Sequence, residues 1–125
     1  MKNKLMLILI VLTVALSSCT KIEELTIANI TVRENSLLKS EVSVHMFDDN
    51  KPPNSNFYKP FYSDKTVVTN DKGLAVFKLK DVYDLSTVDD QTTLYFAVFD
   101  ASDIMLGQTS ITIEKGQTIN KEILF

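Results

Sequence analysis

The sequence predicts an all-β protein, an antiparallel β-sandwich of six to eight strands. Apolar and polar residues alternate with a period of two over most of residues 25–125, which is the pattern of strands that bury one face. No stretch of that region holds a sustained apolar stripe at helical spacing. Turn-forming residues separate the alternating runs, and no predicted helix is long enough to connect parallel strands. Two packed antiparallel sheets are therefore expected.

The first residues of the chain differ from the rest. Lys2 and Lys4 are followed by an apolar run of twelve residues, from Leu5 to Leu16. A basic head and a short apolar run are typical of a secretory signal peptide, so we expect a signal helix that is cleaved off. The run is shorter than the ~20 residues that a membrane-spanning helix needs, which argues against a permanent span.

The end of this run, Leu16-Ser17-Ser18-Cys19, resembles the bacterial lipobox. The resemblance implies that signal peptidase II cuts before Cys19 and that Cys19, the only cysteine in the chain, becomes the lipid-bearing first residue. The alternative is an ordinary secreted protein with a chance cysteine at its cleavage site. The expected organisation is a signal peptide over 1–18, a lipidated N-terminus and short tether over 19–24, and a sandwich domain over 25–125.

The lipobox resemblance also implies attachment to a membrane through the N-terminal lipid. Retention at an inner membrane often depends on Asp directly after the cysteine, and Thr20 stands there instead. We therefore expect an outer-membrane lipoprotein of the cell envelope. Lys21 with Glu23 and Glu24 loosely resembles the surface-export signals of some Gram-negative lipoproteins. The periplasmic and the surface-facing orientation are both left open.

Composition limits the partners of the mature chain. Removing residues 1–18 leaves 107 of the 125 residues, enough for one domain. Eleven Lys and Arg then oppose sixteen Asp and Glu, a net charge of −5. This charge repels phosphate backbones and no basic cluster opposes it, which argues against a nucleic-acid partner. A lone cysteine forms no intramolecular disulfide, so stability must come from packing.

The first half of the domain predicts two strands and an aromatic loop. Residues 25–32 alternate as the first strand and residues 41–47 as the second. The second strand has Val42, Val44 and Met46 on one face and Ser43 and His45 on the other. Residues 48–56, with two prolines and three asparagines, predict a long loop. Pro60 excludes a central strand over 57–62, so this segment is an edge or a structured loop.

A hairpin is predicted next. Residues 66–69 and 74–79 are β-prone and flank Asn70-Asp71-Lys72-Gly73, in which Gly73 supplies the positive φ of the turn. Residues 81–91 predict either a short helical turn or a loop held by spaced apolar residues.

The remaining strands follow in order. Residues 94–99 are apolar on both faces and predict a central strand. The chain turns at 100–103 and returns along 104–113, where Gly107 predicts a bulge or bend. A tight turn at 114–117 leads to the last strand, 118–125.

Two of these segments resemble hairpins of transthyretin-like and carboxypeptidase-regulatory-like domains. Residues 69–77, Thr-Asn-Asp-Lys-Gly-Leu-Ala-Val-Phe, are similar to one hairpin motif, and residues 111–118 are similar to the closing hairpin. The resemblance implies a transthyretin-like sandwich. An immunoglobulin-like or fibronectin-like sandwich is the alternative, although the tryptophan and cysteine pair of a true immunoglobulin core is absent.

The residue types that catalysis requires are sparse. His45 is the only histidine, and together with a single cysteine it cannot complete a metal site of nitrogen and sulfur ligands. No Gly-x-Ser-x-Gly elbow is present. We therefore expect a non-enzymatic protein with no catalytic residue, no metal and no cofactor. Acidic residues in turns leave calcium as an alternative, without EF-hand spacing: Asp48, Asp49, Asp71, Asp89, Asp90, Asp100 and Asp103.

Four aromatic residues crowd one short segment: Phe57, Tyr58, Phe61 and Tyr62. If exposed, they form a binding surface for a protein or a glycan, because aromatic rings dominate binding hot spots. The alternative is a loop that folds over a sheet edge with its rings plugging the core.

These patterns predict a lipid-anchored binding or accessory module of the envelope. One alternative is a structural lipoprotein of a secretion or cell-surface machine. Another is a carbohydrate-binding or carbohydrate-processing accessory lipoprotein, which requires exposed and coplanar rings.

Overall fold

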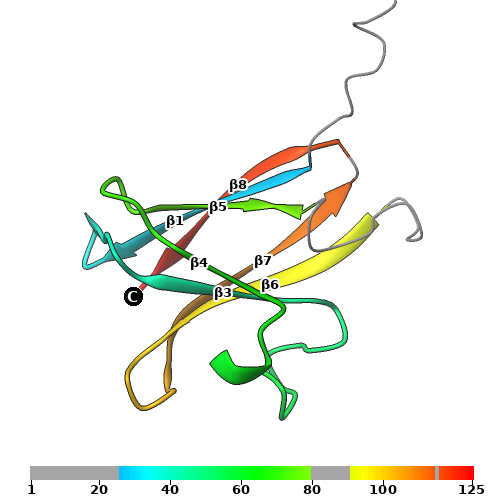
Figure 1. The fold of residues 1–125 in the computed structure, drawn as a ribbon, viewed down its shortest axis with the longest axis horizontal. Helices are drawn as coiled ribbons and strands as arrows, with labels where there is room; N and C mark the ends of the chain where they lie inside the picture. Colours follow the sequence, from blue (N-terminus) through cyan, green and yellow to red (C-terminus); the bar gives the residue numbers. More distant parts are fainter. Residues whose placement is uncertain (1–25, 80–90, 115) are drawn as a thin grey trace, which may run out of the picture.

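Two four-stranded sheets pack face to face in the computed structural model, which describes residues 26–79, 91–114 and 116–125 (Figure 1). Every regular element in these residues is a strand, apart from one short 3₁₀ turn, so the predicted all-β sandwich is confirmed. The signal peptide, the lipobox and the tether lie outside the described residues. So does the turn or loop expected after residue 80.

The elements follow the chain in this order: β1 (Ile27–Glu34), β2 (Leu37–Leu38), β3 (Ser43–Phe47), η1 (Pro60–Tyr62), β4 (Lys65–Val68), β5 (Leu74–Lys78), β6 (Gln91–Phe99), β7 (Met105–Glu114) and β8 (Thr118–Leu124).

Sheet A is built around β1. Strand β5 pairs with β1 antiparallel, from Ile27 opposite Lys78 to Thr31 opposite Leu74. The two-residue β2 pairs antiparallel with the end of β1. Strand β8 pairs with the other edge of β1 and runs parallel to it, so the sandwich is mostly antiparallel and the expectation of wholly antiparallel sheets is wrong at this pair. The last strand of the chain therefore lies beside the first.

Sheet B has the order β4-β3-β6-β7, and all neighbours in it are antiparallel. Strand β6 is central, as its apolar sequence predicts. Strands β6 and β7 form a true hairpin whose register shifts after Val98, which pairs with Gly107, while Phe99 pairs with Met105. The bulge or bend predicted around Gly107 is thus confirmed, with the neighbouring Leu106 as the extra residue. A Cβ on Gly107 would lie 2.8 Å from the Ile123 side chain, so β8 packs closely at this point.

The main core lies between the sheets, because alternation turns one face of every strand inward. Phe77 of sheet A and Phe96 of sheet B meet edge to face, with their ring centroids 4.9 Å apart. The residues buried around this contact are Ala28, Ile30, Val32, Val44, Met46, Ala75, Leu79, Leu94, Val98, Ile111, Ile113 and Ile123.

A second, smaller cluster covers the outer face of sheet B. Phe47 and Ala97 are buried there under Tyr58, and Tyr95 and Phe99 pack against them. Strand β6 is therefore covered on both faces. The covering segment is the loop over residues 48–64, and Figure 1 shows η1 of this loop on the side of sheet B that faces away from sheet A.

The hairpin predicted around Asn70–Gly73 is wrong, although its turn is as expected. Gly73 has a φ of +71°, and the Asn70 side chain accepts hydrogen bonds from the amides of Lys72 and Leu74 at 2.9 and 3.1 Å. The flanking strands do not pair with each other, however. β4 pairs with β3 in sheet B, and β5 pairs with β1 in sheet A.

Buried Thr69 explains this separation. Its hydroxyl donates a hydrogen bond to the Lys39 carbonyl at 2.8 Å and accepts one from the Val42 amide at 3.0 Å. These bonds hold the end of β4 against the residues that lead into β3. On the other side of the turn, the Val32 amide donates to the Gly73 carbonyl at 2.8 Å and ties that end to β1.

The closing hairpin predicted over 111–118 is wrong for a similar reason. β7 pairs with β6, whereas β8 pairs with β1. The turn between them is bonded to the start of β1. The Gly116 amide donates to the Thr26 hydroxyl at 2.8 Å, and the Ile27 amide donates to the Gln117 carbonyl at 2.9 Å. Both turns therefore connect the two sheets.

This strand distribution differs from the immunoglobulin arrangement. In immunoglobulin constant domains the first two strands share one sheet. Here β1 lies in sheet A, while β3, the next strand longer than two residues, lies in sheet B.

Candidate functional site

The aromatic loop, residues 48–64, is anchored by one of its four rings. Tyr58 is only 8% exposed. Its ring centroid lies 4.5 Å from that of Phe47 and 6.0 Å from that of Phe99. Tyr58 was grouped with the surface rings in the sequence prediction, but the structure places it beneath the loop. Tyr58 packs in the small cluster on the outer face of sheet B, so the loop covers that face with this ring and does not plug the main core.

The other three rings are exposed and form a patch that we call the aromatic triad: Phe57, Phe61 and Tyr62. Phe61 is 89% exposed, Phe57 52% and Tyr62 40%. Tyr62 stands between the other two, with centroid distances of 5.2 Å to Phe57 and 5.1 Å to Phe61 and an interplanar angle of 90° in each pair. The triad is therefore an edge-to-face cluster and not a coplanar platform.

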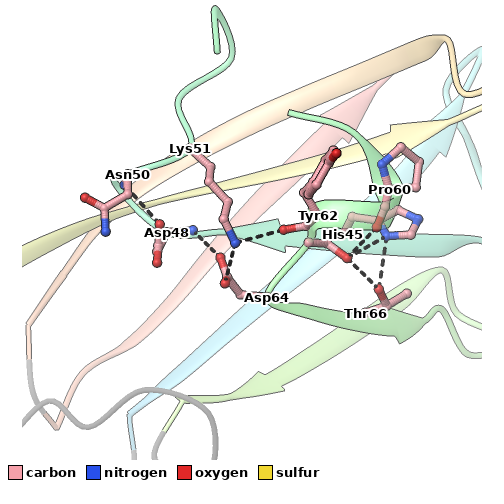
Figure 2. A network of polar contacts seen from close by, with 9 residues as sticks. His45, Asp48, Asn50, Lys51, Pro60, Tyr62, Asp64 and Thr66 are labelled. Carbon is pink, nitrogen blue, oxygen red and sulfur yellow. Dashed lines mark hydrogen bonds and ion pairs between the residues drawn. The ribbon is translucent and has the colours of Figure 1, made fainter. Parts of the chain in front are cut away.

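An ion pair closes the loop, as Figure 2 shows. Lys51 Nζ donates to Asp64 Oδ1 and to the Tyr62 carbonyl, each at 2.9 Å. The other oxygen of Asp64 accepts the Asp48 amide at 2.8 Å. Both charged side chains are about a quarter exposed, at 27% and 26%. No local pattern in the sequence predicts this pair, because Lys51 and Asp64 are thirteen residues apart in the chain.

His45 ties η1 to sheet B (Figure 2). Its Nδ1 lies 3.0 Å from the Thr66 hydroxyl and 3.3 Å from the Ser63 hydroxyl. The Ser63 hydroxyl donates to the Pro60 carbonyl at 2.9 Å, which closes the η1 turn. Burial lowers the pKa of His45, and the negative charge of Asp103 opposes that shift. The prediction that His45 faces away from Val44 and Met46 is confirmed.

A groove of about 460 Å³ opens next to this loop, at one end of the sandwich. Its lining comes from distant parts of the chain: Glu34, Lys39, Glu41, Val42, Ser43, His45, Pro60, Val98, Phe99, Asp100, Ala101, Asp103, Leu106 and Phe125. Only Asp100 and Asp103 were singled out from the sequence as acidic turn residues, and His45 as the sole histidine. The assembly of the groove is a product of the fold alone.

The charges around the groove are mostly acidic. Glu34 is neutralised by Lys39, with a separation of 2.9 Å between their charged atoms. Glu41, Asp100 and Asp103 form no ion pair with any cation in the described part of the chain. Asp100 also uses one oxygen to accept the amides of Ser102 and Ile104.

Neither a metal-ligand cluster nor a spanning helix occurs in residues 26–79, 91–114 and 116–125. No three His, Cys, Asp or Glu side chains are grouped there so that they could hold a metal ion. No helix in the same ranges is long and apolar enough to cross a membrane. Asp89 and Asp90, two of the acidic residues weighed for calcium, lie outside these ranges.

No protein-family model matches the chain, and no curated protein matches it significantly. The argument for function therefore starts from the geometry of the loop and the groove.

Proposed function

We propose that the chain is a lipid-anchored, non-enzymatic binding module of the bacterial envelope, and that its aromatic triad contacts a protein partner. The observation that carries this proposal is the exposure of Phe61 on a closed loop. The Phe61 ring is 89% exposed, and its apolar surface is removed from water only when a partner covers it. Phenylalanine and tyrosine side chains are frequent anchors of such contacts.

The rigidity of the loop supports a binding role. The Lys51–Asp64 pair joins the two ends of the loop, and the buried Tyr58 ring anchors its middle. A surface that is ordered before binding loses less conformational entropy when a partner docks. Exposed rings on a freely moving loop would not have this advantage.

The ring geometry favours a protein over a glycan. Sugar rings stack on open, flat aromatic faces, and the carbohydrate alternative requires coplanar rings. Phe57 and Phe61 instead stand at 90° to Tyr62. An edge-to-face cluster that projects from the surface fits into a pocket between the side chains of a partner protein.

The transthyretin-like resemblance is part of the proposal. The separation of β1 and β3 into different sheets supports it over an immunoglobulin-like sandwich. The position of the triad also fits a tethered module. In Figure 1, β1 belongs to sheet A, whereas η1 lies beyond sheet B. A lipid on Cys19 would attach through β1, which leaves the triad on the opposite sheet.

The anchor is tested by intact-mass spectrometry of the mature protein. We expect a protein that begins at Cys19 and carries acyl chains. Cys19→Ala should give unprocessed or soluble protein. Unchanged partitioning of Cys19→Ala into the membrane fraction would contradict the anchor.

The binding surface is tested by site-specific photo-crosslinking of the full chain in intact cells. A photoreactive phenylalanine analogue at Phe61 should give one discrete adduct with a protein. The same analogue at Val76, which is also exposed but lies in sheet A, serves as the control. Adding Phe57→Ser should weaken the adduct formed at position 61. Equal labelling from positions 61 and 76, or no adduct at all, would overturn the proposal.

A further inference from the structure

We infer that the groove beside the aromatic triad binds a basic, partly apolar segment of the protein partner. This inference rests on the proposed binding function and names the chemical class of the partner. It is carried by three features of the groove, namely its uncompensated charge, its apolar floor and its continuity with the triad.

The charge of the groove selects a cation. After the Lys39–Glu34 pair is set aside, Glu41, Asp100 and Asp103 remain at the groove without an ion-pair partner among the described residues. An anionic ligand would meet repulsion from all three carboxylates. A lysine or arginine side chain would meet attraction, and charge complementarity of this kind selects partners more strongly than it raises affinity.

The apolar lining of the groove favours a partner segment in which an apolar side chain lies next to that cation. Val98 is buried there, and Phe99 and Phe125 are partly buried beside it. Leu106 is 43% exposed at the same groove. Charges next to apolar walls interact in a lower effective dielectric constant than charges in open water, which strengthens their attraction for a cation. A free metal ion or a small hydrated amine would leave the floor uncovered.

The groove and the triad form one continuous surface. Pro60 lines the groove and is the first residue of η1, which carries Phe61 and Tyr62. Phe99 lines the groove and packs against Tyr58, the anchor of the aromatic loop. One partner can therefore cover the triad and fill the groove with the same stretch of chain.

Backbone bonds hold the groove in shape. The Asn35 amide donates to the Phe125 carbonyl at 2.9 Å, and the Phe125 amide donates to the Arg33 carbonyl at 3.1 Å. The Glu41 amide donates to the Thr69 carbonyl at 3.1 Å. These bonds fix the backbone from which the Glu41 and Phe125 side chains project, which lowers the entropy that binding costs.

The test uses the full chain, labelled with ¹⁵N and held in micelles of an uncharged detergent. The probes are two pentapeptides, Gly-Arg-Leu-Arg-Gly and Gly-Glu-Leu-Glu-Gly, both capped at their ends. We expect the arginine peptide to shift amide resonances of the groove in a saturable way, and the glutamate peptide to shift none. Raising the salt concentration from 50 to 500 mM should weaken the binding of the arginine peptide severalfold.

Two substitutions locate the effect. Glu41→Gln with Asp103→Asn removes two charges while keeping side-chain size, and Asn tolerates the left-handed backbone at position 103, where φ is +61°. We expect this double substitution to lower the affinity for the arginine peptide about tenfold. The matched control, Glu122→Gln with Asp49→Asn, removes the same charge from positions that do not line the groove and should change affinity less than twofold.

The outcomes separate this inference from the proposed function. No saturable shift at the groove, or an equal loss of affinity in the control pair, would overturn the inference even if crosslinking at Phe61 succeeds. Peptide binding at the groove without any adduct at Phe61 would leave the groove assignment standing and overturn the triad. Phe61→Ser should abolish the partner adduct of a crosslinker at Phe57 while leaving the pentapeptide affinity unchanged.

Discussion

Lys51 and Asp64 lie thirteen residues apart and meet in an ion pair of 2.9 Å that closes the loop carrying the aromatic triad (Figure 2). The same lysine also donates to the carbonyl of Tyr62, a member of the triad. One cation therefore joins the ends of the loop and contacts the backbone of the triad.

Removing this cation should loosen the loop before it affects the sandwich. For Lys51→Met we expect a loss of about 1 kcal/mol in the free energy of local opening, because the pair is only partly screened by water. Hydrogen exchange of amides in residues 48–64 should accelerate about fivefold, which is the rate factor for that energy. Lys59→Met, in the same loop, removes a charge that forms no ion pair in the described residues. Equal exchange rates in Lys51→Met and Lys59→Met would contradict the role of the Lys51–Asp64 pair in holding the loop closed.

The buried hydroxyl of Tyr58 predicts a stabilising substitution. Its oxygen has no hydrogen-bond partner in the described structure, and an unpaired buried polar group costs about 1 kcal/mol or more. We expect Tyr58→Phe to raise the free energy of unfolding at pH 7 by about 1 kcal/mol, measured by urea denaturation. Tyr58→Leu keeps the apolar character but loses the ring contacts with Phe47 and should destabilise.

Tyr58 also predicts a loss of stability at alkaline pH. Burial, reinforced by the nearby Tyr95, raises the pKa of Tyr58 from 10.0 to about 12. Between these values the unfolded chain loses the phenolic proton while the folded chain keeps it, so stability falls as the pH rises. The contribution is at most about 2.7 kcal/mol. Wild type should lose more stability than Tyr58→Phe between pH 9 and pH 12, and parallel pH profiles would refute this assignment.

His45 predicts a loss of stability on the acid side. Burial lowers its pKa below 6.5 despite the opposing charge of Asp103. As the pH falls below 6.5, the unfolded chain binds a proton before the folded chain does, so stability decreases until the folded pKa is passed. His45→Gln should flatten the dependence of unfolding free energy on pH between 7 and 5. Asp103→Asn should steepen it, and an unchanged slope in His45→Gln would rule out this source.

Gly73 is the residue whose replacement should damage the turn between the sheets. A Cβ there would lie 3.0 Å from the Lys39 amide nitrogen, and the φ of +71° disfavours any other residue. We expect Gly73→Ala to cost about 2 kcal/mol in thermal or urea unfolding. Lys72→Ala, at the exposed neighbouring position, should stay within about 0.5 kcal/mol of wild type.

The strand patterns were predictable where they depend on a single strand. Successive side chains point to opposite faces, so the alternation around His45 indicates its face without knowledge of its neighbours. The apolar run of β6 indicates a strand covered on both sides, and Gly107 indicates a bulge. These are local properties, and the structure confirms them.

The pairing of strands was not predictable from the same patterns. Asn70–Gly73 forms the expected turn, and yet the strands on its two sides enter different sheets. Turn chemistry determines how the chain bends, whereas the sheet that each strand joins depends on contacts such as Thr69 with Lys39, thirty residues away. Pairing of this kind needs information from distant parts of the chain.

The candidate site divides in the same way. Alternating residues in the sequence do not predict which ring of the segment 57–62 is buried, because the loop has no regular period. Tyr58 points into the cluster with Phe47 and Ala97, while its neighbour Phe57 points to solvent. The groove is even less predictable from the sequence, because Glu41, Asp103 and Phe125 come to line it only when the sheets pack.

The amino-acid sequence on its own thus determined the all-β class, the faces of the strands and the positions of the turns, because each of these depends on residues that are neighbours in the chain. The tertiary structure decided the strand partners, the burial of Tyr58 and the placement of three carboxylates around one groove. Those features arise from packing and hydrogen bonds between segments that are far apart along the chain.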